Sequence, residues 1–334
     1  MSIKVIQGGF LTTVQDLGRF YYQQFGVSPG GAMDGRSLRL GNILVGNDEN
    51  TAGLELTATG PLLEFWSDTV IAVTGGDMQP CINHVPIQMY RAIRVKKGDM
   101  ISFRGLKSGF RSYLTFSGGV DVEPIMGSRS TLLKAGIGGY KGRKLQTGDM
   151  IPLGTPRKDL YRFSQRVLPQ EDYSSNVVTL RILLGPQEDR FTANGLRTLL
   201  KQQYCVSEQC DRMGYRLEGP AIEHKSDANI ITDGIALGSI QVPGDGKPII
   251  MMADRQSTGG YTKIGTVISS DIPKLAQCRP GTMLQFQTID IEKAQAFYRQ
   301  ERREYEDLKE AYSHPILEWT ITDIDDHTII LTEI

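Results

Sequence analysis

The chain has 334 residues, with 37 Lys and Arg against 38 Asp and Glu, and a formal net charge of -1. This length allows two domains or one large one, and the near-neutral charge gives no electrostatic argument for binding nucleic acid or an anionic membrane. Glycine is abundant at 37 residues but has no three-residue period, which excludes collagen, and 40% hydrophobic content disfavours disorder.

The four cysteines show no C-x-x-C spacing, so we expect reduced thiols rather than a disulfide framework. The four histidines are too scattered to indicate a metal site. The amino terminus has no apolar run of signal-peptide length, and no apolar stretch reaches 18 residues. We therefore expect a cytoplasmic protein with no membrane span.

Short apolar runs separated by glycine turns dominate the chain. Runs of four to eight residues rich in β-branched side chains are typical of strands. The expected strands are 70–73, 101–103, 113–116, 177–184, 249–252, 266–268 and 329–331.

Four helices are expected. Asp34 is the N-cap of the first, which ends at Gly46-Asn47, and the second runs from Thr192 to about residue 200. The third follows residues 270–271, with a proline in its first turn. The fourth, over 291–312, has one apolar stripe and densely charged remaining faces, which favours packing on the body of the protein; binding a partner is the alternative.

A faint repeat links 98–103, 148–153 and 281–286, each with glycine, a small polar residue, Met and an aliphatic residue in sequence. This pattern predicts a turn glycine that leads into a strand with alternate side chains pointing inward. Without a fixed period it indicates related β-units rather than a propeller or solenoid. We therefore predict a mainly β protein of two β-barrel-like units with few helices, divided near residues 155–176.

Two clusters of polar residues lie at glycine-containing turns. Residues 12–19 place Gln15, Asp16 and Arg19 around one bend, and residues 210–216 carry Arg212 and Arg216. These last two arginines are either anion clamps or ion-pair partners at the surface. No phosphate-binding P-loop, H-E-x-x-H or G-x-S-x-G motif occurs, and the glycines of 136–142 fit a tight turn better than a phosphate cradle.

The segment 254–263 directly follows the most apolar strand, a usual place for binding chemistry. Arg255 could hold a carboxylate or phosphate, with Lys263 as a second positive charge. Gly259 and Gly260 would let backbone N–H groups approach an oxyanion. Alternatively, Asp254 and Arg255 satisfy each other in a structural turn, and the spacing leaves both readings open.

Together these clusters resemble one known family. The motifs cover about residues 5–290 in order and resemble the biotin-dependent carboxyltransferase-like family, and within it the family of 5-oxoprolinase C subunits. Departures from its pattern occur at Tyr21, Gly30 and Thr262. The motifs are 12–19, 31–34, 42–47, 127–131, 211–216, 238–246 and 254–261.

The resemblance implies tandem cyclophilin-like β-barrel domains over 1–165 and 166–290, with a charged helix and a C-terminal strand or tail over 291–334. It also implies an ATP-dependent hydrolase that opens 5-oxo-L-proline to L-glutamate with 5-oxoprolinase subunits A and B, the B subunit being the most direct partner. ATP with Mg would be shared with those subunits, and no metal site is expected on this chain.

The same resemblance assigns roles to the polar clusters. Cations would hold phosphate and the substrate carboxylate, backbone amides at 259–260 would stabilise negative charge, and Asp16 or Asp254 would accept a proton. Of the Gly-Gly pairs, 30–31 and 259–260 are expected to line the site. The expected catalytic residues are Asp16, Asp254, Arg255 and Lys263, and the expected substrate-binding residues are Gln15, Arg19, Gly30, Gly31, Arg212, Gln256, Thr258, Gly259, Gly260 and Tyr261.

Two alternatives follow from relatives in the same family. In urea carboxylase this module transfers a carboxyl group from carboxybiotin, but no Met-Lys-Met sequence occurs here, so we expect no covalently attached biotin on this chain. Other members are regulators that bind the homologue of the B subunit and relieve its inhibition of a sensor kinase. The sequence leaves both open.

Overall fold

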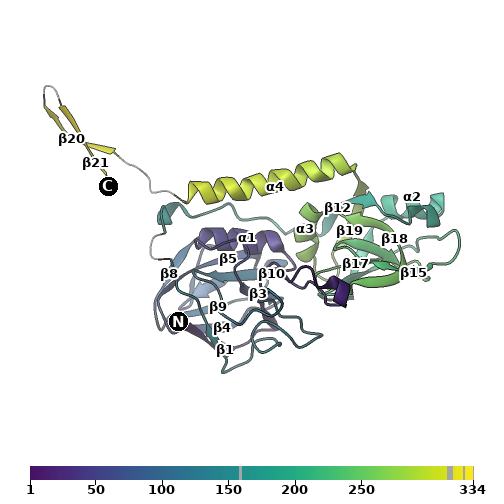
Figure 1. Cartoon of the computed structure of the whole chain (residues 1–334), viewed down its shortest axis with the longest axis horizontal. Helices are drawn as coiled ribbons and strands as arrows, with labels where there is room; N and C mark the ends of the chain where they lie inside the picture. The colour runs from purple at the N-terminus through teal and green to yellow at the C-terminus, as the bar shows by residue number, and fades with distance from the viewer. Residues whose placement is uncertain (158–159, 314–318, 326–327, 334) are drawn as a thin grey trace.

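The computed structural model describes residues 1–157, 160–313, 319–325 and 328–333. Two β-rich halves lie side by side, and one long helix, α4 (Ile291–Ala311), lies across both (Figure 1). The prediction of a mainly β chain with few helices is confirmed. Within the described ranges, no helix is both long and apolar enough to cross a membrane.

The first half consists of two sheets, one of six strands in the order β11-β1-β4-β9-β6-β7 and one of five in the order β2-β3-β10-β5-β8. Both sheets contribute to one hydrophobic core, in which Phe65 and Phe116 meet edge to face at 6.5 Å between ring centroids. The strands are β1 (Ser2–Gln7), β2 (Leu11–Gln15), β3 (Gly53–Thr57), β4 (Leu62–Phe65), β5 (Thr69–Asp77), β6 (Pro80–Ile82), β7 (Val85–Pro86), β8 (Ile93–Val95), β9 (Met100–Phe103), β10 (Ser108–Phe116) and β11 (Met150–Pro152).

The second half is an eight-stranded sheet in the order β12-β19-β13-β14-β17-β16-β18-β15. An additional pairing of β12 with β18 closes this sheet into a barrel, with β15 attached outside the ring. Its core is separate from that of the first half. The strands are β12 (Val177–Leu184), β13 (Tyr204–Cys210), β14 (Gly214–Glu218), β15 (Asn229–Gly234), β16 (Ser239–Val242), β17 (Ile249–Met251), β18 (Thr258–Val267) and β19 (Met283–Thr288).

All seven expected strands are confirmed, the last as part of a C-terminal hairpin of β20 (Trp319–Asp325) and β21 (Thr328–Glu333). The remaining elements lie between strands of the two halves. They are η1 (Gln23–Phe25), α1 (Gly35–Leu44), η2 (Phe163–Gln165), η3 (Glu188–Arg190), α2 (Ala193–Lys201), η4 (Ser269–Asp271) and α3 (Ile272–Ala276). The domain boundaries at 165/166 and 290/291 stay a prediction.

The expected N-cap of the first helix is confirmed, and the second helix begins at the expected residue, where the structure shows a second cap. The Asp34 carboxylate accepts a hydrogen bond from the backbone N–H of Ser37 at the start of α1, and the Thr192 hydroxyl accepts one from Gly195 at the start of α2. These side chains satisfy backbone donors that the first turn of a helix leaves without partners. Pro273 lies in the first turn of α3, as the sequence predicts.

The three repeated glycines share one backbone conformation. Gly98, Gly148 and Gly281 have φ of 91°, 90° and 88°, and each precedes a strand, β9, β11 and β19. A side chain at any of them would meet open space. The repeat therefore encodes a left-handed turn that favours glycine for its backbone freedom rather than for close packing.

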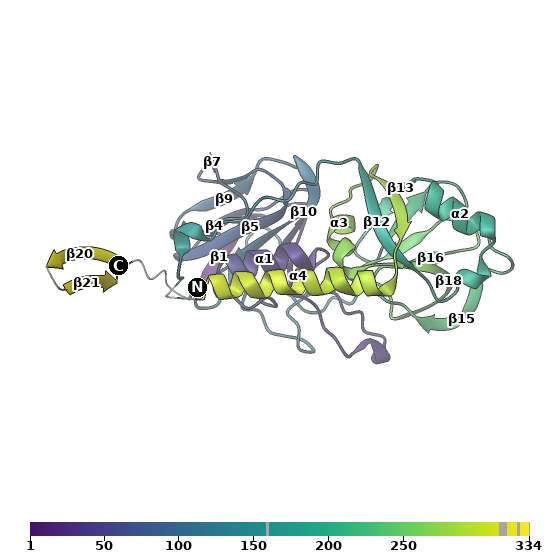
Figure 2. The same ribbon diagram turned by 90° about the horizontal axis from the view of Figure 1, so that it is seen from above.

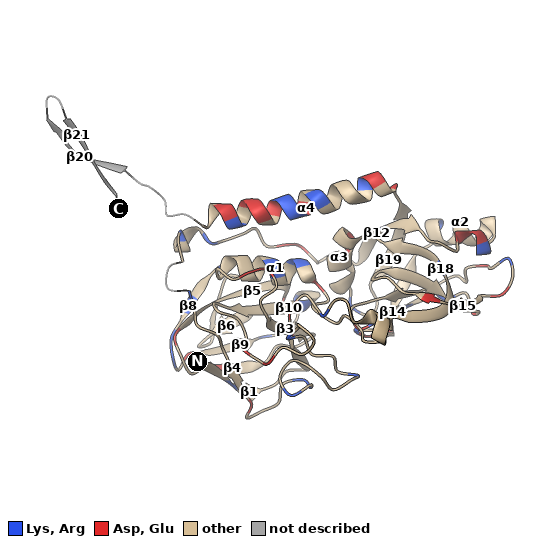
Figure 3. Ribbon diagram, viewed as in Figure 1, with Lys and Arg blue, Asp and Glu red and all other residues tan. Residues whose placement is uncertain are grey.

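Helix α4 holds the two halves together. Seen from above, the helix runs along both halves (Figure 2), and Tyr305 is fully buried against the first half. Acidic and basic residues alternate along its outer faces (Figure 3). Glu49 forms ion pairs with Arg302 and Lys309 of this helix. Ion pairs and a buried aromatic ring thus anchor its C-terminal half.

In the N-terminal half of α4, the apolar stripe is not fully packed on the body, contrary to the expectation from the sequence. Ile291 and Tyr298, on the same apolar stripe, remain 49% and 50% exposed. They line a shallow apolar cavity together with Leu237 and Ile272 of the second half. The apolar stripe of α4 therefore packs on the body of the protein near the C-terminal end of the helix and stays partly exposed near its N-terminal end.

Candidate active site

The candidate site lies where loops of the first half meet the loop after β17. Gly30 N–H donates to the carbonyl of Ala253 at 3.2 Å, and the Ser28 hydroxyl donates to the carbonyl of Arg255 at 2.7 Å. Asp16 directly follows β2, and Asp254 lies three residues after β17. Both loops therefore begin at strand ends, which hold them in fixed positions.

Gly30 and Gly31 shape this junction. Their φ angles are 65° and 89°, and a Cβ on Gly31 would lie 2.7 Å from the carbonyl group of Leu17. Only glycine fits such a close backbone approach at a left-handed conformation. Gly259 and Gly260 differ, because they lie within β18 at ordinary φ, with Gly259 opposite Asp233 of β15.

Arg212 is the centre of a buried ion-pair network between the halves. Its Nε and Nη2 donate to the two carboxylate oxygens of Asp254 at 3.0 and 2.9 Å, and its Nη1 donates to Glu55. Burial alone would lower the pKa of Arg212, but the charges of Asp254 and Glu55 outweigh this and raise it. Arg212 is thus an ion-pair partner within the protein, and Asp254 pairs with it rather than with Arg255.

Asp16 organises the loops of the first half. Its Oδ1 accepts hydrogen bonds from Gly18 N–H at 2.8 Å and from the Ser128 hydroxyl at 2.7 Å. The Ser130 hydroxyl and the Arg129 N–H donate to the same carboxylate. A role as proton acceptor would therefore compete with four existing bonds.

Arg19 is the cation with free hydrogen-bonding capacity. It is only 1% exposed, and its Nη2 donates to the carbonyl of Ser130. Its Nε and Nη1 have no hydrogen-bond partner in the described part of the chain. Burial lowers the pKa of Arg19, and the nearby charges of Asp16 and Asp254 oppose this only in part. Buried donors without partners are costly, so this guanidinium is suited to receive an anion.

Arg255 is a second buried cation, and its hydrogen bonds go to neutral groups. Its Nε donates to the carbonyl of Ile235 at 3.0 Å, and its Nη1 donates to the carbonyl of Met252 at 3.3 Å. Burial lowers the pKa of Arg255 to about 10. Arg19 and Arg255 thus both lack a directly bonded carboxylate, Arg19 at the junction and Arg255 beside the carbonyl of Ile235, which follows β15.

The other expected residues are exposed or have partners outside the Arg212 network. The Lys263 amine pairs with the Asp233 carboxylate at 2.8 Å, on the β15 side of the barrel. Gln256, Thr258 and Tyr261 are exposed along the loop and the start of β18. Gln15 is fully buried and donates to Thr13 and Thr131.

The sequence analysis did not single out Glu55 or Gln277, two polar residues that join the halves. Glu55 accepts hydrogen bonds from the Tyr113 hydroxyl at 2.6 Å and from Met33 N–H at 2.8 Å. Gln277 donates to the Asp34 carboxylate at 2.7 Å, which extends the contact between the halves. A charged residue between Leu54 and Leu56 in an apolar strand was the available signal for Glu55. Nothing in the sequence around Gln277 distinguishes it.

Comparison with known proteins identifies the family to which the chain belongs. Residues 25–288 match the family described as carboxyltransferase domain, subdomain A and B. The chain belongs to this family, as the resemblance of its motifs predicts.

The chain is similar to several individual proteins of known name or structure. The chain is 36% identical to the C subunit of 5-oxoprolinase from Escherichia coli K12 over 306 residues, which cover 92% of this chain and 97% of that one. It is 32% identical to the urea amidolyase of Lachancea kluyveri, covering 88% of this chain and 17% of that one. The solved structure of Kluyveromyces lactis urea carboxylase matches with a TM-score of 0.86 at 29% identity, covering 97% of this chain and 32% of that one.

Proposed function

We propose that this chain is the C subunit of an ATP-dependent 5-oxoprolinase that acts with subunits A and B to hydrolyse 5-oxo-L-proline to L-glutamate in the cytoplasm. The observation that carries this proposal is the end-to-end match to the E. coli protein, of which the chain covers 97%. The urea amidolyase match covers only 17% of that longer protein, so it supports a shared module rather than a shared activity.

The geometry of the junction supports an anionic ligand. Of the four cations that the sequence analysis proposed, Arg212 and Lys263 are already neutralised by carboxylates. Arg19 and Arg255 are not, so we assign them to the substrate carboxylate or to a phosphate, with Arg19 as the main contact.

The junction does not fit Mg-ATP by itself. Asp16 and Asp254, the carboxylates that could hold Mg²⁺, are fully engaged by Ser128, Ser130 and Arg212. Among the described residues, no group of three or more His, Cys, Asp or Glu gathers in a way that could hold a metal ion. We therefore derive no step through the nucleotide on this chain and assign its binding to the assembled complex.

The test is reconstitution of the three subunits. The complete complex should release glutamate from 5-oxoproline only when ATP is present. Arg19→Gln should lower kcat/KM about a hundredfold, because it removes charge-assisted hydrogen bonds to the ligand. Arg216→Gln, on the exposed face of β14, is the matched control and should retain full activity.

Two results would contradict the proposal. A soluble, complete complex without ATP-dependent turnover argues against the oxoprolinase assignment. If Arg19→Gln retains activity while the complex stays assembled, the buried guanidinium is structural. Arg19→Lys separates these effects, since it keeps the charge and should retain more activity than the glutamine variant.

The second candidate is the carboxyltransferase component of a biotin-dependent carboxylase. The match to urea carboxylase over 97% of this chain favours it. Carboxyl transfer from free carboxybiotin to urea or 5-oxoproline, without partner subunits, would support this alternative. The same assay without biotin distinguishes it from the oxoprolinase reaction.

A further inference from the structure

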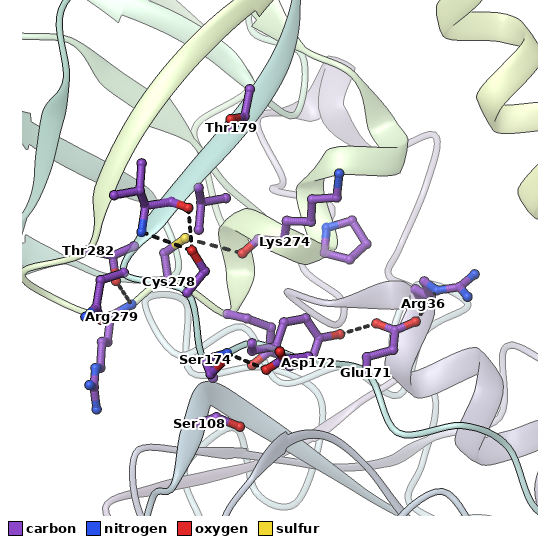
Figure 4. A pocket seen from close by; sticks show the side chains of 18 of the residues that line it. Arg36, Ser108, Glu171, Asp172, Ser174, Thr179, Lys274, Cys278, Arg279 and Thr282 are labelled. Atoms are coloured by element: carbon purple, nitrogen blue, oxygen red, sulfur yellow. Dashed lines mark hydrogen bonds and ion pairs between the residues drawn. The ribbon is translucent and has the colours of Figure 1, made fainter.

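A second cavity lies between the two halves, separate from the junction of Arg19 and Asp254. It has a volume of about 580 Å³, within the range typical of small-molecule sites. Its walls are the start of β10, residues 171–176 of the segment that connects the halves, the start of β12, and residues 273–282 around the end of α3 (Figure 4). None of the expected site residues lines it.

Positive charge is in excess on these walls. Four of the lining residues are Lys or Arg, against two acids, Glu171 and Asp172. Glu171 already accepts from Arg36 at 2.6 Å and from the Tyr173 hydroxyl, as the dashed lines in Figure 4 show. Asp172 accepts from Ser174 N–H at 2.8 Å. The acids are thus occupied by neighbouring groups of the protein.

Two cations keep capacity for a ligand. Arg279 has no side-chain hydrogen bond or ion pair with any residue that the structure describes. Lys107 is 70% exposed and reaches Asp77 only at 3.4 Å. In contrast, Lys274 pairs with Asp271 at 2.8 Å. Arg279 is therefore the preferred anchor for an anion, because its planar guanidinium can bind a carboxylate through two hydrogen bonds.

The remaining walls offer apolar surface. Tyr173, Val178 and Pro273 line the cavity between the charged groups. Gly109, at φ 74°, allows the backbone to approach Gln277, since a Cβ there would lie 2.7 Å from its Oε1. The wall is therefore closely packed at this point and the cavity is formed without a ligand.

We propose that this cavity binds a small organic carboxylate, with the carboxylate at Arg279 and a ring or aliphatic body against Tyr173, Val178 and Pro273. The ligand would contact both halves and the segment that connects them. Its binding should therefore raise the unfolding temperature of the chain, by an amount that grows with the logarithm of the ligand concentration above the Kd.

The experiment uses 2-naphthoate as the probe and 2-naphthamide as its neutral counterpart. Isothermal titration calorimetry on the full chain should give saturable binding of the naphthoate and at least tenfold weaker binding of the amide. Arg279→Gln should raise the Kd for naphthoate ten- to a hundredfold. Ser174→Trp, which places a large side chain on the wall, should abolish binding.

A control variant defines the site. Arg197→Gln removes an exposed arginine of α2 and should leave the Kd unchanged. The proposal is overturned if naphthoate does not bind at millimolar concentration, or if it binds equally well to the Arg279→Gln and Ser174→Trp variants. Equal affinity for naphthamide would overturn the requirement for an anion.

Discussion

Replacing Arg212 with methionine is expected to destabilise the chain by about 3–5 kcal/mol. Methionine keeps much of the volume of the arginine stem but leaves Glu55 and Asp254, which are 1% and 5% exposed, without their shared cation. Removing one partner of a buried ion pair costs about that much, because the remaining charge stays desolvated. The loss is a large part of the 5–15 kcal/mol typical of a folded protein.

The assay is urea denaturation followed by circular dichroism and by fluorescence. Arg216→Met, on the exposed face of the following strand, is the matched control and should change the free energy of unfolding by no more than about 0.5 kcal/mol.

A triple variant tests the cause. Adding Glu55→Gln and Asp254→Asn to Arg212→Met replaces both stranded charges with neutral groups of similar shape, and should recover at least half of the lost stability. The reasoning is refuted if the single variant costs less than about 1 kcal/mol, or if the triple variant is no more stable than the single one.

Three further predictions concern stability. Burial raises the pKa of Asp34 to about 6, so the folded state loses stability as pH rises from about 4 to above 6. Between pH 4 and pH 7, the free energy of unfolding of Asp34→Asn should therefore rise by about 3 kcal/mol relative to that of the wild type in urea titrations. A difference that stays constant with pH would refute this. Gly281→Ala should cost about 1–2 kcal/mol because of its positive φ, whereas Gly244→Ala, at ordinary φ in open space, should have little effect. Tyr305→Ala should cost about 3–5 kcal/mol by emptying a buried site on α4, and Tyr298→Ala, half exposed, should cost far less; equal losses would contradict the packing described.

Local signals in the sequence predicted the elements well. The aspartate before residues 35–44 and the threonine before 193–201 have the side chains that cap helices, and both helices begin there. The repeated Gly-polar-Met pattern depends on backbone conformation at single residues, so it could be interpreted without knowledge of the tertiary structure.

The candidate site was predictable only in part. The motifs predicted catalytic or substrate-binding roles for Arg19, Gly30, Arg212 and Asp254. The structure brings these four residues to one junction. Which cation is neutralised depends on partners distant in the chain: Glu55 is 157 residues from Arg212 in sequence. Pairings at that separation follow from how the halves pack, which no local pattern records.

The closure of the second barrel has a consequence for how the chain folds. Its first strand, β12, pairs in parallel with its last, β19, and Val177 lies opposite Met283. Pairing at such separation is slow to form, because a long loop must close before any contact is gained. During synthesis, β12 stays an unpaired edge until β18 and β19 have left the ribosome, so premature termination before residue 258 would expose an aggregation-prone strand.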